Sequence, residues 1–427
     1  MLTEELGELG AAREALARER LEELQALART YRNWTVKELA HALGRQPGRL
    51  VPDSGMPKID LVVGLAKALD WPVEAVVDHL MKPPSTGRRV SPMSDCANDF
   101  AKLYDQSLQK RLELDHIDAI RLAIRAGAVA DNPTRRAAAL IIESDAHQSV
   151  GSYVESVRCL REAIRIEGIA VDWRLYCDAR LANMLFMQGQ TSHALGIAAS
   201  VLDYAQKVPN SVVLRTAQLL AHWSRGHVLR TAIPMESIES WRSLAGSARE
   251  DFRKARDLCA ELAEETDGKP IYFGSFLGVI DPVLLELDAV CDESQEESVV
   301  RALLAIVREN GSVEPSLGER KAWAAVALAN TVKRFVVDEM QRRGMLEVAS
   351  ATLRAHAVAT SNWYFAHKHL ELDAERRRFL SGNGTASRAL DAMEAKLVAG
   401  VLGQVHSSRG NAAEFLALYG SKEGART

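Results

Sequence analysis

Apolar residues recur at every third or fourth position along most of the chain, which is the spacing of one buried face of an α-helix. The first such stretch covers residues 3–31, where leucines and alanines share one face and Glu and Arg dominate the other. We predict a helix there. Its charged face is either an ordinary solvated surface or a dimer contact, because the helix runs straight into the next module.

One stretch breaks this periodicity. Residues 82–94 carry three prolines, one glycine and two arginines with little apolar patterning, which is typical of a linker. We therefore predict an N-terminal domain at 1–82, a linker at 83–94 and a long helical domain at 95–427.

The N-terminal domain reads as a set of short helices. We predict helices at about Leu21–Tyr31, Val36–Leu43, Ile59–Leu69 and Val73–Met81, with a short segment after Gly44. Thr35 followed by Glu38 has the spacing of a capping box, and Gly44 ends the same helix as a C-terminal glycine does.

Two of these segments resemble the XRE/Cro-type helix-turn-helix family. Residues 33–44 (Asn-Trp-Thr-Val-Lys-Glu-Leu-Ala-His-Ala-Leu-Gly) resemble its second helix and turn, and residues 57–77 resemble its fourth and fifth helices. The resemblance implies DNA binding. It places Arg45, Gln46 and Arg49 in the major groove and Arg32 or Lys37 on a phosphate.

The segment that would read bases departs from the family pattern. Pro47 can begin a helix, but Gly48 weakens it and Pro52 ends it, so at most residues 47–51 can be helical, with Leu50 as buried anchor. From residue 29 to residue 60 the net charge is +3, a thin phosphate-binding patch. Two interpretations stay open: direct DNA binding, or a degenerate domain kept for protein contact.

The second domain shows a period of 34 to 38 residues. Gly151 and Gly189 each follow a helix and precede small or apolar residues five, nine and twelve positions later. A third copy has its turn at Gly344 and a weaker copy near residues 114–115. The pattern resembles tetratricopeptide (TPR) repeats, which implies an α-solenoid of helical hairpins. Residues 226–330 are irregular and form either longer hairpins or inserted loops.

The TPR resemblance also implies a groove for an extended peptide. Asn183 lies six residues before Gly189, where the family carries an amide that contacts peptide backbone. Tyr176, Phe186 and Met187 would share its groove-facing side. The alternative for Asn183 is an ordinary exposed helix position.

Composition narrows the function classes. Ala, Leu, Arg and Glu dominate and aromatic residues make up only 6%, so we predict an all-α fold. A net charge of −4 excludes a global basic field for nucleic acid. We find no zinc-spaced cysteines, phosphate loop or catalytic motif, and His367 and His369 lie on different helix faces. We therefore expect no metal, no cofactor and no catalytic activity.

Together these features resemble the two-part bacterial transcription regulators, including the peptide-pheromone receptors. We predict a cytoplasmic, non-membrane homodimer that binds DNA and senses a peptide or protein partner through its repeats. A ligand in the groove would shift the spacing of paired DNA-binding heads. The alternative is a protein-interaction adaptor whose head no longer binds DNA.

Overall fold

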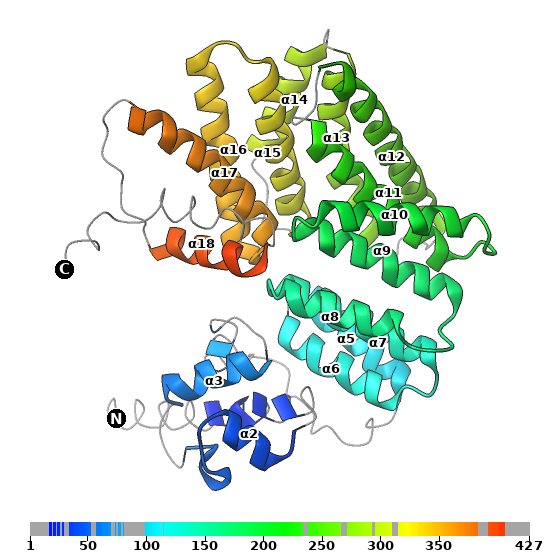
Figure 1. Cartoon of the computed structure of the whole chain (residues 1–427), viewed down its shortest axis with the longest axis vertical. Coiled ribbons are helices and arrows are strands. Elements are labelled where there is room, and N and C mark those ends of the chain that lie inside the picture. The colour runs from blue at the N-terminus through cyan, green and yellow to red at the C-terminus, as the bar shows by residue number, and fades with distance from the viewer. Residues whose placement is uncertain are drawn as a thin grey trace, which may run out of the picture. The chain divides into compact units, whose positions relative to one another are not determined.

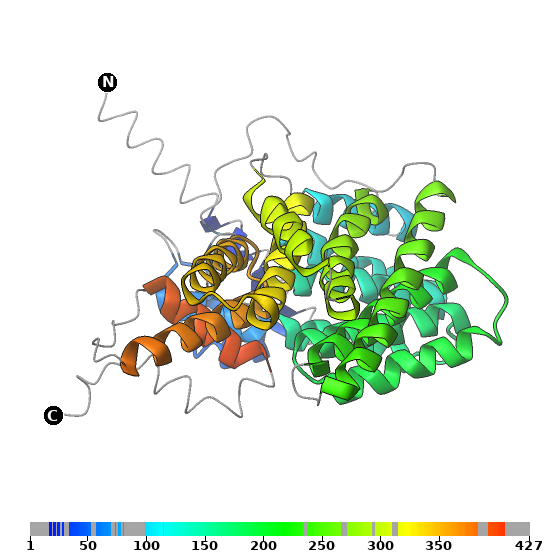
Figure 2. The same ribbon diagram turned by 90° about the horizontal axis from the view of Figure 1, so that it is seen from above.

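The computed structural model is built from α-helices, and no strand occurs among the residues that it describes (Figures 1 and 2). These residues are 17–18, 20–22, 24–25, 28–29, 34–52, 57–69, 73, 76–77, 80, 99–113, 115–233, 238–265, 271–292, 295–309, 315–382 and 392–405. The predicted all-α fold is confirmed. The predicted linker at 83–94 lies outside the described residues.

The elements follow one another as helices joined by short connections. They are α2 (Val36–Ala42), the 3₁₀ helix η1 (Pro47–Arg49), α3 (Ile59–Leu69), α5 (Phe100–Leu112), α6 (His116–Val129), α7 (Pro133–Ser149), α8 (Tyr153–Ile164), α9 (Val171–Met187), α10 (Thr191–Ala205), α11 (Val212–Ala232), α12 (Ile238–Glu265), α13 (Ile271–Cys291), α14 (Glu296–Arg308), α15 (Pro315–Phe335), α16 (Glu339–Thr360), α17 (Trp363–Gly382) and α18 (Ala392–Gln404).

The chain forms two compact units, Met1–Cys159 and Leu160–Thr427.

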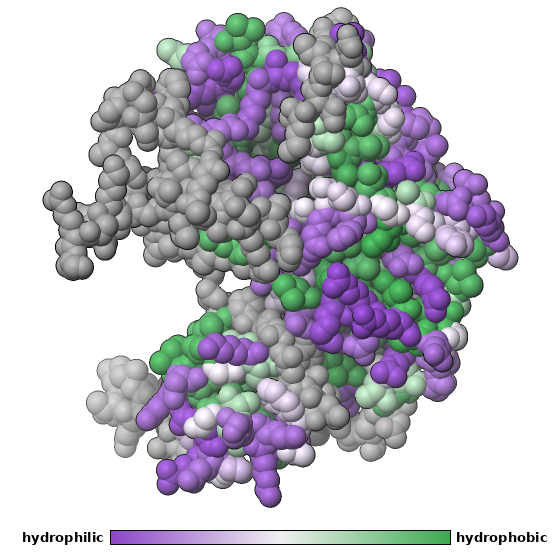
Figure 3. Space-filling model, viewed as in Figure 1, coloured by the Kyte–Doolittle hydropathy of each residue, from purple (hydrophilic) through white to green (hydrophobic). Residues whose placement is uncertain are grey.

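On the face drawn in Figure 3, hydrophilic and apolar side chains alternate over the described residues. None of the helices in the described part of the chain is both long and apolar enough to span a bilayer.

The start of the first unit, which we call the head (residues 17–80), follows the predicted local rules. Thr35 accepts a hydrogen bond from the Glu38 backbone, while the Glu38 carboxylate accepts one from the Thr35 backbone at 2.7 Å. This reciprocal pair is the predicted capping box, and it satisfies two backbone donors that α2 would otherwise leave open. Gly44 has φ 63°, which a residue with a Cβ adopts only with strain.

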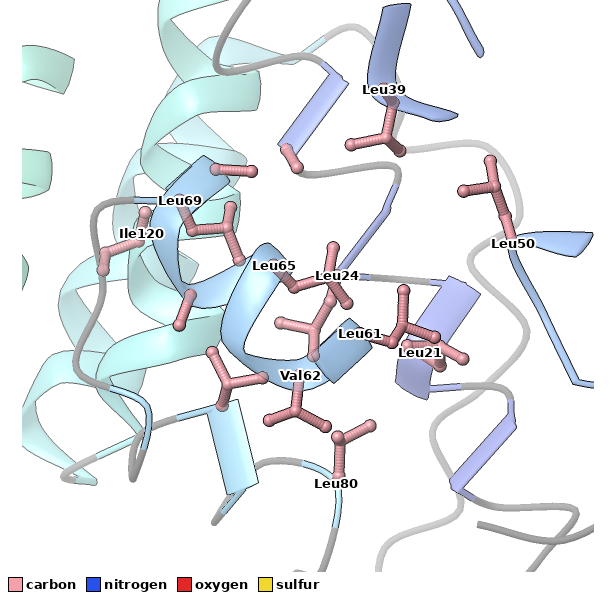
Figure 4. Packing of buried hydrophobic residues seen from close by; sticks show 14 of the residues in the cluster. Leu21, Leu24, Leu39, Leu50, Leu61, Val62, Leu65, Leu69, Leu80 and Ile120 are labelled. Carbon is pink, nitrogen blue, oxygen red and sulfur yellow. The ribbon is translucent and has the colours of Figure 1, made fainter. Parts of the chain in front are cut away.

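The head has an apolar core that continues into the first helical hairpins. Leu24, Leu39 and Leu65 are fully buried, and Leu50 anchors the turn after η1 as predicted (Figure 4). The same cluster includes Ala119 and Ile120 of α6 and Ala146 of α7. Each large side chain buried in this way stabilises the unit by roughly 1.5–3 kcal/mol, so the head and these hairpins share one core.

Helical hairpins make up the rest of the chain. In the first unit α6 packs against α5 and α7, and in the second unit α9 packs against α10 and α11. Gly151 and Gly189 have φ 78° and 76°, so the two predicted turn glycines do reverse the chain. α5 ends at Leu112 and α6 begins at His116, and the weaker predicted turn falls between these two helices.

The predicted turn at Gly344 is wrong. Gly344 lies inside α16, whose N-cap is Asp338: the Asp338 side chain accepts a hydrogen bond from the Gln341 backbone at 2.7 Å. The chain therefore turns at about residues 336–338, before the predicted place. An isolated glycine within a helix costs only about 1 kcal/mol relative to alanine, so its presence alone did not require a turn.

Of the two alternatives for residues 226–330, the structure has longer hairpins. α12 runs for 28 residues from Ile238 to Glu265, and α13 continues through Pro282. The helices drawn from green to yellow lie side by side in both views (Figures 1 and 2). Their pairing, α11 with α12 and α12 with α13, extends the antiparallel stacking of the repeats.

Candidate functional site

The described residues that were predicted to contact DNA lie along α2, η1 and the segment between them. Lys37, Gln46 and Arg49 are all exposed, as DNA contact would require. Beside Lys37, an open hollow of about 360 Å³ is lined by Trp34, Lys37, Glu38, His41 and Ala42. Arg32, the other predicted phosphate contact, lies outside the described residues.

Arg45 differs from the other predicted DNA contacts because it is paired. Its guanidinium donates to the Asp60 carboxylate at 2.5 Å, with 26% of the Arg45 side chain and 66% of the Asp60 side chain exposed. An exposed pair of this kind contributes at most about 1 kcal/mol, so Arg45 can exchange Asp60 for a phosphate at small cost.

The element that would enter the major groove is very short. η1 is a single 3₁₀ turn of three residues, within the five-residue limit predicted from Pro47, Gly48 and Pro52. The segment that follows the turn is bonded to helical residues that precede α2: Gln25 donates to the Leu50 carbonyl at 2.7 Å, and Arg18 donates to the Pro52 carbonyl at 2.8 Å. The head therefore holds a short turn that carries Arg49 in place of a long recognition helix.

The residues predicted to line a peptide groove divide into two pairs. Tyr176 and Asn183 are half-buried on α9, and the Asn183 amide makes no hydrogen bond to any other described residue. Phe186 and Met187 lie on the same helix but are only 2% and 5% exposed. The structure thus leaves the first pair within reach of a ligand and places the second pair in the interior.

Phe186 is buried because four rings from four helices close a circle around the centre of the second unit. Phe186 of α9 stacks on His227 of α11 with centroids 5.0 Å apart, and His227 stacks on Trp323 of α15 at 4.3 Å. Trp323 contacts Tyr364 of α17 at 5.4 Å, and Tyr364 contacts Phe186 at 5.3 Å. We call these residues the ring circle. The array curves far enough for α9 and α17 to meet.

A buried polar network lies beside the ring circle. Arg230 and Glu286 form an ion pair, with Nε and Oε2 2.9 Å apart, and both residues are under 5% exposed. Asn330 donates to the other carboxylate oxygen of Glu286 at 3.0 Å. One signal for this network is visible in the sequence, a single glutamate within the largely apolar α13.

Polar atoms of the ring circle remain unsatisfied. Tyr364 Oη and His227 Nε2 are buried and have no hydrogen-bond partner among the described residues, and the same is true of Ser224 Oγ on α11. Burial, and then the charge of Arg230, hold the pKa of His227 well below its usual value, while burial raises the pKa of Tyr364. A small rearrangement that brought a polar ligand group to these atoms would be favourable, because a buried unpaired polar atom costs about 1–3 kcal/mol.

Two half-buried histidines of the second unit, His356 and His367, are expected to make its stability depend on pH. Burial lowers the pKa of His356 and of His367 to about 4, against about 6.5 when unfolded. The unfolded chain then binds more protons between these values, so stability is present above pH 6.5 and is lost as pH falls toward 4. Burial raises the pKa of Asp178 to about 6, so this carboxyl has the opposite effect on stability: it favours the folded chain as pH falls.

We therefore expect the free energy of unfolding to be lower at pH 5 than at pH 7.5 by roughly 1–2 kcal/mol for each such histidine, less the opposing part from Asp178. Urea unfolding at the two pH values measures the difference. His356→Asn should remove part of it. Equal stability at both pH values would contradict the assignment of these half-buried histidines as neutral in the folded chain.

Comparisons with known proteins give a distant likeness to solved structures and nothing at the level of sequence families. No protein-family model matches the chain, and no curated protein matches it. One similar solved structure carries the description "Crystal Structure of Rap Protein Complexed with Competence and Sporulation Factor". The two sequences are 15% identical, the match covers 93% of this chain and 99% of that chain, and the TM-score is 0.41. A likeness at this level establishes neither a shared family nor a shared function.

Proposed function

We propose that this protein is a DNA-binding transcriptional regulator whose helical repeats sense a peptide or protein partner. The observation that carries the sensing half is the closure of the ring circle, in which Phe186 of α9 meets Tyr364 of α17 at 5.3 Å. An array held closed by side-chain contacts at one place has a natural second state, in which those contacts open.

The partner would act by shifting the population between these two states. Asn183 and Tyr176 offer an amide and an aromatic face on α9, one to three turns before Phe186. A peptide that bound to them and separated α9 from α17 would gain the unsatisfied groups of Tyr364 and His227 as partners. A ligand shifts such an equilibrium only by its difference in affinity for the two states, and these buried groups supply that difference.

The head would contact DNA mainly through phosphates. Lys37 on α2 and Arg49 on η1 are exposed cations, and Gln46 is the exposed N-cap of η1. A single 3₁₀ turn reaches few base edges. We therefore expect the affinity for DNA to come chiefly from contacts with the DNA phosphate backbone and to depend strongly on salt. Two heads in a homodimer would restore specificity through the spacing of their half-sites.

A second candidate function is a protein-interaction adaptor. Two observations favour it: η1 has only three residues, and Arg45 is already paired with Asp60. In that case the hollow beside Trp34 and Lys37 would receive protein rather than a phosphate backbone. The two functions differ in one property, DNA binding at low salt, which the regulator retains and the adaptor lacks.

The sensing half is tested at Asn183. Asn183→Ala should weaken binding of a peptide selected from a library by about 1–3 kcal/mol, because the peptide backbone loses a partner in a partly desolvated site. The melting temperature should stay close to that of the parent, since the Asn183 amide makes no hydrogen bond within the described fold. Titration and a melting curve give both quantities.

Asn210→Ala serves as the matched control, because Asn210 is an exposed amide in the connection between α10 and α11. It should change neither binding nor melting. Unchanged affinity in Asn183→Ala would remove this residue from the partner site. A large drop in its melting temperature would make the residue structural.

A further inference from the structure

The α7–α8 hairpin brings three buried side chains with metal-ligating atoms together. Glu143 and His147 lie one turn apart on α7, and Cys159 lies opposite them on α8. One ligand atom from each lies within 4.8 Å of the other two. Among the residues that the structure describes, this is the one group of three His, Cys, Asp or Glu side chains so arranged.

The distances between the ligand atoms suit a small tetrahedral ion. Cys159 Sγ lies 3.3 Å from Glu143 Oε1, and His147 Nε2 lies 3.7 Å from the same oxygen. Bonds of 2.0–2.3 Å from a zinc ion would place neighbouring ligand atoms about 3.3–3.8 Å apart. Two of the three distances between ligand atoms already fall in this range, and the third is within 4.8 Å.

The three residue types select among metals. A thiolate, an imidazole and a carboxylate together favour Zn²⁺ and related borderline ions over Mg²⁺ or Ca²⁺, which prefer oxygen alone. All three residues are at most 5% exposed, so water competes weakly for the ion. Three protein ligands leave a fourth position for a water molecule or another small ligand.

Arg158 supplies the positive charge in the metal-free hairpin. Its Nη2 lies 3.5 Å from Glu143 Oε1 and 3.6 Å from Cys159 Sγ, while its Nε donates to Glu155 at 2.5 Å. The Arg158 side chain is 39% exposed, so it can turn toward water and keep Glu155 as its partner. An incoming cation would replace it beside Glu143.

We propose that Glu143, His147 and Cys159 form a binding site for a zinc-like divalent cation, which competes with Arg158 and ties α7 to α8. On binding, the Cys159 thiol gives its proton to the solvent and the thiolate bonds to the metal, with no change in oxidation state. The ion would stabilise the first unit because it binds the folded hairpin and not the unfolded chain.

Co²⁺ is the probe, since its bond to a thiolate has a charge-transfer band in the near ultraviolet. The full-length chain, reduced and freed of metal by a chelator, should develop this band with one equivalent of Co²⁺ and lose it on addition of Zn²⁺. Cys159→Ser should abolish the band. Cys291→Ser, a partly exposed cysteine at the end of α13, should leave it unchanged.

Arg158→Ala separates the proposal from a purely structural role of the cluster. If the cation competes with Arg158, this variant should bind Co²⁺ roughly tenfold more tightly, because one positive charge near the ligands is gone. Circular dichroism verifies that each variant keeps its helices. Absence of the band in the parent, its persistence in Cys159→Ser, or unchanged affinity in Arg158→Ala would each overturn the proposal.

Discussion

Replacing Glu286 with alanine should lower the free energy of unfolding by about 3–5 kcal/mol, one of the two largest effects that we expect from a single substitution. Glu286 is the counter-charge of Arg230, which is 3% exposed and cannot reach water without moving its helix. Glu286→Ala leaves that guanidinium buried and unpaired, and it also removes the acceptor of Asn330. Urea unfolding followed by circular dichroism measures the loss.

Two further variants assign the effect to burial. Asp288→Ala, on the same helix, breaks a partly exposed pair with Arg249 (3.3 Å) and should cost at most about 1 kcal/mol. The double variant Arg230→Met with Glu286→Leu should recover most of the stability, because no charge is then left unpaired. A loss below about 1 kcal/mol in Glu286→Ala would mean that the pair is not buried in solution.

Trp323→Ala should cost a similar amount, about 3–5 kcal/mol, by opening a cavity at the ring circle. Trp323 is 2% exposed, and besides His227 and Tyr364 it contacts Phe365 at 5.1 Å and Trp223 at 5.3 Å. These neighbours belong to two other helices, α11 and α17, so they cannot move inward to fill the space without shifting those helices. The same unfolding experiment gives the value.

Trp173→Ala is the matched control for the ring circle. Trp173 is half-buried near the start of α9, with Tyr176 as its aromatic neighbour at 6.1 Å. Its removal should cost clearly less than that of Trp323, because solvent already reaches it. Equal losses in the two variants would show that the ring circle is no better packed than the surface of α9.

Much of the fold could be predicted from the sequence through local capping and turn patterns. The capping box of Thr35 and Glu38, the left-handed Gly44 and the α3 range Ile59–Leu69 all follow from interactions between residues close in the chain. The turns at Gly151 and Gly189 do so as well. The repeat spacing alone did not predict the turn correctly at Gly344, because α16 already begins after its N-cap, Asp338.

The candidate site was harder to predict from the sequence, because it depends on how strongly the array of helices curves. The repeat period identifies which helices pair, but it does not say whether α9 and α17 meet. Their contact buries Phe186, which an open array would leave exposed to a ligand. Arg230 and Glu286 are separated by 56 residues, so no local pattern connects them.

A salt series tests most directly whether the head binds DNA through the phosphates, as we propose. Anisotropy of labelled random and genomic duplexes with the full-length chain should show binding at low salt, and the logarithm of the affinity should fall linearly with the logarithm of salt concentration. Lys37→Ala should reduce the slope by about one. No measurable affinity for any duplex at low salt would contradict the account and leave the adaptor as the function of this chain.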